Sequence, residues 1–299
     1  MSNLSTTRPQ PTEGLAAFLA RRSVARGLRQ GATYLALIIV MTVCLLPMLY
    51  MVSTSLKPPG TETEFPIRWI PSRFVWDNYV RAATIVPMLT YLKNTLIIAG
   101  FSVVGNLLTA SLAAYGFARL RFPGRDALFM LMLSTMMLPY MVVIIPLFVL
   151  FRELGWVDTL YPFTVPAFLG GRALYIFLLR QYFKGLPMEL DEAAKIDGAG
   201  FFRIWWTILM PLARPALGTV AILCLVASWN DFVGPMIFLN STENFTLALG
   251  TRAFHGQYTM ELNLTMAFST MMTLPILTVF FLFQKYMIKG ISMTGITGR

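Results

Sequence analysis

Residues 94–118 read NTLIIAGFSVVGNLLTASLAAYGFA, a stretch of 25 residues without a charged side chain. Residues 32–56 (ATYLALIIVMTVCLLPMLYMVSTSL) form a second uncharged stretch of the same length. A helix of about 20 apolar residues spans the roughly 30 Å of hydrocarbon in a bilayer. Each stretch is therefore long enough to cross a membrane, and the predicted fold class is an all-α integral membrane protein.

The composition of the whole chain agrees with this class. Its 299 residues are 56% hydrophobic and 13% charged, whereas soluble domains carry about 25% charged residues. The formal net charge of +10 would suggest a nucleic-acid ligand in a soluble protein. Here the cations gather at the ends of the apolar stretches, as topology signals do. We therefore expect membrane lipid around the chain and no nucleic-acid partner.

Six membrane-spanning helices account for the apolar stretches, and we place them near residues 33–55, 95–117, 127–149, 160–180, 215–236 and 266–287. The third is the best defined, because only Pro139 and Pro146 interrupt it. The fourth contains Arg172, and the fifth contains Asn230 and Asp231. Polar groups at membrane depth are costly, so these two spans are the ones expected to line a cavity or contact a partner helix.

An even number of spans places both termini on one side of the membrane. Sixteen Lys and Arg residues fall in the segments on the side of the termini and seven on the other side, with Arg172 inside a span. Because Lys and Arg are enriched in cytoplasmic loops, both termini are predicted to be cytoplasmic. Residues 1–31 form a basic leader, of which residues 14–31 are either a short amphipathic helix on the inner leaflet or a solvated segment. Residues 32–299 form the membrane domain.

The longest cytoplasmic loop, residues 185–215, reads GLPMELDEAAKIDGAGFFRIWWTILMPLARP. Pro187 stands where a helix can begin, and the acidic residues that follow suit the positive end of a helix dipole. Gly198 and Gly200 end that helix. A second helical segment follows and reaches Pro211. Two short helices joined by a glycine turn are the predicted result.

This loop resembles the EAA loop of bacterial ABC importer permeases. Its residues match that family's pattern in spacing throughout, with Met210 in place of the usual leucine: Glu192, Ala193, Ala194, Asp197, Gly198, Ile208 and Pro211. Further segments resemble the carbohydrate-uptake, maltose-type branch: SLKPP (55–59), RQYF (180–183), AAKIDGAG (193–200), SWNDF (228–232) and QKYMIKGISMTGITGR (284–299). The resemblance covers roughly residues 33–299.

The resemblance implies the permease fold of a type I ABC importer, in the cytoplasmic (inner) membrane of a bacterium. It implies a permease subunit that imports a sugar or oligosaccharide, with a second homologous permease, two copies of a cytoplasmic ATPase and an extracytoplasmic solute-binding protein as partners. The EAA residues would couple ATPase closure to alternating access. The chain has no Gly-Lys pair and hence no phosphate-binding P-loop. ATP and Mg²⁺ are thus expected on the ATPase, with no cofactor, catalytic residue or metal site on this chain.

Trp229, Asn230 and Asp231 are the candidate residues of the substrate pathway. A sugar binds by stacking on aromatic faces and by hydrogen bonds to its hydroxyls, which suits Trp229 and Asn230. The same residues would also serve to join helices or to form part of a gate. Arg172 either pairs with Asp231 across the bundle or extends its charge to the membrane surface from a broken helix.

Three other functions fit parts of the pattern. An ABC permease for a polyamine or a phosphate ester would share the coupling loop. An ion-coupled secondary transporter would carry inverted repeats, which the sequence does not contain. A membrane-embedded enzyme would need acidic or histidine clusters inside its spans, and these spans hold almost none.

Overall fold

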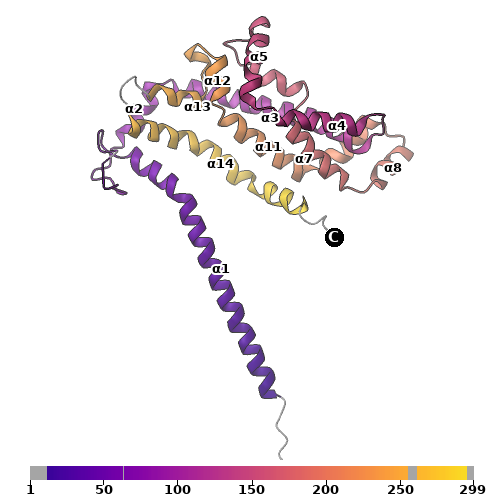
Figure 1. Ribbon diagram of the computed structural model, residues 1–299, viewed down its shortest axis with the longest axis horizontal. Helices are drawn as coiled ribbons and strands as arrows, with labels where there is room; N and C mark the ends of the chain where they lie inside the picture. The colour runs from indigo at the N-terminus through magenta and orange to yellow at the C-terminus, as the bar shows by residue number, and fades with distance from the viewer. Residues whose placement is uncertain (1–11, 63, 255–260, 295–299) are drawn as a thin grey trace, which may run out of the picture.

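The computed structural model describes residues 12–62, 64–254 and 261–294, and within these ranges the regular structure is helical, without a strand (Figure 1). Four helical segments are long and apolar enough to cross a membrane: Arg29–Ser55, Met88–Arg119, Tyr161–Lys184 and Leu262–Gln284. Two bent pairs of helices raise the number of candidate spans to six. The predicted all-α membrane fold with about six spans is confirmed.

Helix α1 (Thr12–Ser55) is a single helix that contains both the leader from Thr12 onward and the first span. It slants away from the other helices and meets them only near its carboxyl end (Figure 1). None of its most apolar 18-residue window is buried. Helix α1 continues through the boundary predicted after residue 31, because no proline interrupts it there and a single glycine does not end a helix.

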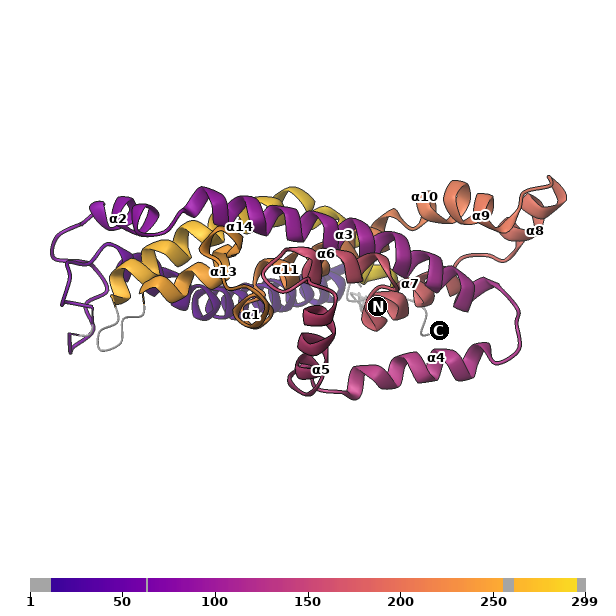
Figure 2. The same ribbon diagram turned by 90° about the horizontal axis from the view of Figure 1, so that it is seen from above.

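The core of the protein forms around α3 (Met88–Arg119), which packs along α7 (Ala173–Lys184) and α11 (Arg214–Trp229) (Figures 1 and 2). Helix α14 (Leu262–Thr294) packs in turn against α11 and α1. Small residues of α3 lie at these contacts, and Ala110 and Ala114 are fully buried. Small side chains allow helix backbones to approach closely, which is how membrane helices gain packing energy.

The predicted third span, residues 127–149, is not one helix. It consists of α4 (Arg125–Ser134), a 3₁₀ turn (Thr135–Met137) and α5 (Tyr140–Glu153), and the two parts are bent by 98° (Figure 2). The break falls at Pro139, whose backbone is extended. Proline lacks an N–H and disfavours helical geometry in the residue before it. Pro146 lies inside α5 without ending it.

The fourth span is also broken, into α6 (Tyr161–Thr164), a 3₁₀ turn (Val165–Phe168) and α7. Such a break is tolerated at membrane depth only where other protein groups satisfy the freed backbone. Side chains of α3 do so here: Ser102 donates to the Phe163 carbonyl at 2.9 Å, Thr109 donates to the Ala167 carbonyl at 3.0 Å, and Asn106 accepts from the Arg172 N–H at 3.1 Å.

The fifth span begins and ends differently from the predicted 215–236. Helix α10 (Met210–Leu212) meets α11 at an angle that bends the segment Phe201–Trp229 by 81°. Helix α11 ends at Trp229, and a separate short helix, α12 (Val233–Phe238), follows. Asn230 and Asp231 thus lie at a break between two helices.

Asp158 joins the loop after α5 to the loop between α12 and α13 (Leu247–Gly250). Its carboxylate accepts hydrogen bonds from the backbone N–H groups of Asn240 and Ser241 at 2.9 and 2.8 Å, and from the Ser241 hydroxyl. Asn244 donates to its carbonyl at 2.6 Å. Asp158 has φ 62°, a left-handed conformation that Asp and Asn tolerate better than other side chains. Asp158 thereby ties these two loops together.

The charge of Asp158 makes this connection between the two loops depend on pH. Burial opposes ionisation, but the hydrogen bonds from Ser241, Asn240 and Asn244 outweigh it and lower the pKa of Asp158 from 3.8 to about 2. A carboxyl with a lowered folded-state pKa adds stability above pH 3.8, which is lost as the pH falls through about 2. Asp158→Asn keeps the backbone preference and removes the charge. The melting temperature of the purified wild-type protein should exceed that of the variant above pH 3.8, and the difference should disappear as the pH falls to about 2. A difference in melting temperature that does not change with pH would contradict the assignment.

Candidate coupling loop and membrane cavity

The predicted coupling loop forms two short helices that project from one end of the bundle, opposite the end that carries α2 (Asp77–Ile85) (Figure 2). Helix α8 (Glu189–Ile196) has three acidic residues in its first turn. Helix α9 (Phe201–Ile204) leads into a π-helical turn (Trp205–Leu209) and then α10. The predicted arrangement of two helices joined by a glycine turn is what the structure shows.

Gly198 is the residue that ends α8. It has φ +77°, in the left-handed region that side chains with a Cβ rarely adopt. Its N–H donates to the Lys195 carbonyl at 3.0 Å, and the next N–H, of Ala199, donates to the Ala194 carbonyl at 2.8 Å. These two bonds make a Schellman motif, which stops a helix and reverses the chain. Gly200 follows in an ordinary extended conformation.

The EAA residues are divided between two faces of α8. Glu192, Ala193, Asp197 and Gly198 are exposed, whereas Ala194 is buried against the bundle. In the second half of the loop, Ile208 is half-buried beside the same apolar cluster and Pro211 is exposed. The structure thus leaves most of the predicted site residues exposed, whereas Ala194 and Ile208 pack against the bundle.

Apolar side chains that the sequence prediction did not single out lie on the outer surface of the loop. Ile196 is 86% exposed, and Phe201, Phe202 and Trp206 are each more than half exposed. Large apolar residues gathered on a surface mark a contact with another protein or with lipid. The signal was present in the sequence as FFRIWW (201–206) inside a loop expected to be aqueous.

The side chain of Asp191, next to the EAA residues, points into the bundle, away from the exposed surface of the loop. It is 2% exposed, and its Oδ2 lies 3.6 Å from Nε of Arg119, the last residue of α3. Burial raises the pKa of Asp191, and the charge of Arg119 opposes that rise. The sequence prediction missed this pair because the two residues are far apart along the chain.

Within the membrane region, a cavity of about 290 Å³ lies between α3, α5, the broken fourth span and the carboxyl ends of α11 and α12. Its wall combines polar and aromatic side chains, among them Ser102, Asn106, Tyr140, Arg172, Ser228, Asp231, Phe151, Phe163 and Phe238. Binding sites for small polar ligands have this character, with a few polar groups set among aromatic ones.

The three predicted pathway residues have different surroundings. Asp231 lines the cavity and accepts a hydrogen bond from the Gly234 N–H at 3.1 Å. Asn230 is exposed, and its amide donates to the Val226 carbonyl of its own helix. Trp229 is 2% exposed and donates from Nε1 to the Met272 carbonyl of α14 at 3.2 Å. Trp229 thus joins two helices and has no free ring face in this structure.

Arg172 and Asp231 both line the cavity, but their side chains do not form an ion pair with each other. Arg172 is the residue before α7, where the fourth span resumes after its break. The direct pairing considered from the sequence is therefore not present, and Arg172 extends from a broken helix. The two opposite charges face the same polar space.

Trp229 provides a test of these placements. Trp229→Ala removes a buried aromatic side chain, a change that costs about 3–5 kcal/mol in protein cores. It should lower the amount of assembled protein, whereas Trp229→Phe keeps most of the packing and loses only the bond to Met272. Uptake per assembled transporter should stay near wild type in Trp229→Phe. The same should hold for the Trp229→Ala protein that does assemble. A several-fold loss of uptake per assembled transporter in Trp229→Ala but not in Trp229→Phe, which keeps an aromatic face, would return Trp229 to the substrate pathway.

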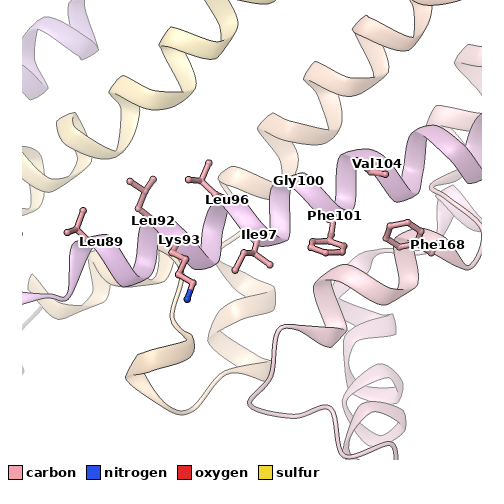
Figure 3. Close-up of a pocket in the computed structure, with 9 residues that line it drawn as sticks. All are labelled: Leu89, Leu92, Lys93, Leu96, Ile97, Gly100, Phe101, Val104 and Phe168. Atoms are coloured by element: carbon pink, nitrogen blue, oxygen red, sulfur yellow. The ribbon is translucent and has the colours of Figure 1, made fainter.

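A second hollow, of about 640 Å³, runs along the flank of α3. Figure 3 shows its side chains, which are apolar apart from Lys93: Leu89, Leu92, Leu96, Ile97, Phe101, Val104 and Phe168. An apolar groove of this kind suits lipid tails or another apolar helix and not a sugar. Within the described residues, no group of three His, Cys, Asp or Glu side chains is placed to hold a metal ion.

The proteins that this chain resembles in sequence and in fold are named as components of transport systems. The chain is 34% identical over 86% of its length to an arabinooligosaccharides transport system permease protein of Halalkalibacterium halodurans, covering 92% of that protein. It is 32% identical over 87% of its length to a trehalose/maltose transport system permease protein of Thermococcus litoralis, covering 94% of it. The crystal structure of a bacterial ABC transporter that imports the acidic polysaccharide alginate shares the fold. That match has a TM-score of 0.73 and 24% identity, and covers 94% of this chain and all of the other.

A model of one protein family, described as the binding-protein-dependent transport system inner membrane component, matches residues 105–293. This range contains the coupling loop, the broken fourth and fifth spans and the cavity between them. Because this match covers more than half of the chain and a relative is 34% identical over 86% of it, the chain belongs to the family of inner membrane components of binding-protein-dependent transport systems.

Proposed function

We propose that this chain is one of two homologous permease subunits of an ATP-driven importer for a sugar or oligosaccharide. The observation that carries the proposal is the cavity, whose hydroxyl, amide and aromatic groups suit a ligand with many hydroxyls. Relatives named as permeases for arabinooligosaccharides, for trehalose and maltose, and for maltodextrin in Bacillus subtilis support the same substrate class.

The family works with a separate ATPase and with a solute-binding protein, so the membrane-enzyme and secondary-transporter alternatives do not apply. The finer assembly that we propose contains a second permease and two copies of the ATPase. The exposed helix α1 and the apolar groove beside α3 support a second permease, because both leave apolar surface without a protein partner. ATP and Mg²⁺ would be held by the ATPases.

The contact with an ATPase is assigned to the exposed face of the coupling loop. Glu192, Ala193, Asp197 and Gly198 form its polar part. Exposed apolar residues such as Ile196 and Phe202 lie on the same loop. A surface of this composition, a few charges among large apolar groups, suits a groove on a partner protein. Residues 32–299 would form the permease domain and residues 1–31 its cytoplasmic leader.

The orientation in the membrane follows from the excess of Lys and Arg on one side, which would place both termini in the cytoplasm. A cysteine at Ser2 or Thr297, positions outside the described residues, should react with a membrane-impermeant reagent only from the cytoplasmic side. A cysteine at Ser72, an exposed residue of the loop between α1 and α2, should react only from outside. Labelling of position 72 from the cytoplasm would overturn the six-span topology.

The decisive experiment purifies this chain with its membrane and ATPase partners and measures ATP hydrolysis in proteoliposomes that contain the solute-binding protein. A panel of mono- and oligosaccharides, a polyamine and a phosphate ester would be compared. Stimulation of ATP hydrolysis and uptake by a saccharide is the expected result. If only the polyamine or the phosphate ester stimulated ATP hydrolysis, the chain would still be a permease subunit, but its substrate would not be a saccharide.

A further inference from the structure

The contact between the coupling loop and the bundle has an apolar part and a charged part. Ala194, Ile204 and Trp205 bury apolar surface against the cluster that includes Ala114 and Tyr115 of α3. Apolar contacts are not directional, so they hold the loop on the bundle without fixing its orientation. The charged part lies at the carboxyl end of α3, at Arg119.

The Arg119 guanidinium reaches under α8 and contacts the segment that leads into it. Nη2 donates to the Leu186 carbonyl at 2.9 Å, and Nη1 points at the sulfur of Met188. Nε lies 3.6 Å from Oδ2 of Asp191, on the inner face of α8. A single side chain therefore contacts the start of α8 at three points.

Both charged side chains of this pair are buried, each being 3% exposed. Nε of Arg119 and Oδ1 of Asp191 have no hydrogen-bond partner. With water excluded, each charge has the other as its main compensation, and separating them would leave an uncompensated charge in the protein interior. A displacement of α8 must therefore carry Arg119 with it.

Arg119 ends a continuous helix that also lines the membrane cavity. Ser102 and Asn106 of α3 face the cavity and hold the backbone of the broken fourth span at Phe163 and Arg172. Asn106 lies 13 residues before Arg119, a distance of about 20 Å along a helix. Helix α3 thus joins the coupling loop to the cavity wall.

We propose that Arg119, through its buried pair with Asp191, is the positioning residue that transmits movement of the coupling helix to α3 and so to the membrane cavity. This inference rests on the proposed function, since it requires that the loop is moved by an ATPase. It adds a residue outside the EAA residues to the machinery that links ATP hydrolysis to import.

The test compares Asp191→Asn, Arg119→Met and the exchanged pair Arg119→Asp with Asp191→Arg in the complete complex in proteoliposomes. Arg121→Met is the matched control, because Arg121 is exposed two residues away. The measurement is solute imported per ATP hydrolysed, together with the amount of assembled complex. Both single variants should lower this ratio by about fivefold or more while ATP hydrolysis continues. The exchanged pair should recover most of the ratio, and the control should match wild type.

Two results would overturn the inference. One is an unchanged ratio in Asp191→Asn and Arg119→Met. The other is a loss of import that follows only the amount of assembled complex, which is the behaviour of a purely structural pair. A wild-type complex that shows no ATP-driven import would instead refute the proposed function, so the two failures are distinguishable.

Discussion

Gly198→Leu is expected to abolish solute-stimulated ATP hydrolysis and import while leaving membrane insertion near normal. A Cβ at this position would meet no atom within 4 Å, so the damage does not come from a clash inside the chain. It comes from φ +77°, which costs a residue with a Cβ about 1–2 kcal/mol, and from a bulky side chain placed on the exposed face that we propose contacts the ATPase. Relief of the strain would break the bonds that end α8 and turn the helix away from its partner.

The comparison of Gly198→Ala with Gly200→Ala isolates the backbone effect. Both glycines are exposed and have open space for a Cβ, but Gly200 has φ −72°, which every residue tolerates. Gly200→Ala should be close to wild type and Gly198→Ala should be impaired. Import by Gly198→Leu at more than about half the wild-type rate per complex would contradict the assigned role of the turn.

Glu192→Lys is expected to have a similarly large effect, for a different reason. Glu192 is exposed on the surface of α8, whereas the adjacent Asp191 is buried against the bundle. Reversing the charge puts repulsion where a complementary surface would approach, a change that costs several kcal/mol in protein interfaces. ATP hydrolysis should no longer respond to solute, and the ATPase should be lost more readily during purification.

Glu243→Lys is the control for Glu192→Lys. Glu243 is also exposed and acidic, but it lies in the loop between α12 and α13, away from the coupling loop. The same change in net charge should there leave ATPase binding and stimulation unaltered. Equal behaviour of the two variants would mean that net charge, and not the position of Glu192, controls the coupling.

Much of the coupling loop was predictable because its signals are local. Helix start, acidic first turn and glycine stop all lie within about a dozen residues, and each acts through backbone hydrogen bonds of its own segment. What the spacing could not indicate is the division of α8 into an outer and an inner face, with Glu192 outward and Asp191 and Ala194 inward. That division depends on where α3 lies, which is a long-range property.

The spans show the same contrast. Residues 127–149 are apolar almost throughout, and hydropathy therefore predicts a straight helix, yet the chain bends by 98° at Pro139. Hydropathy measures the preference of side chains for lipid and does not report where the backbone finds partners. The break in the fourth span depends on Ser102, Asn106 and Thr109 of α3, which satisfy backbone groups some 60 residues away.

By itself, the sequence determined the membrane class, about six spans and the two-helix coupling loop, because each depends on apolar length or on local hydrogen bonding. Only the tertiary structure decided that Trp229 is buried against α14, that Asp231 lines a cavity with polar and aromatic walls, and that Arg119 meets Asp191. The physical reason is that burial and pairing of polar groups are set by neighbours distant in the chain, and those neighbours are known only when the helices are packed.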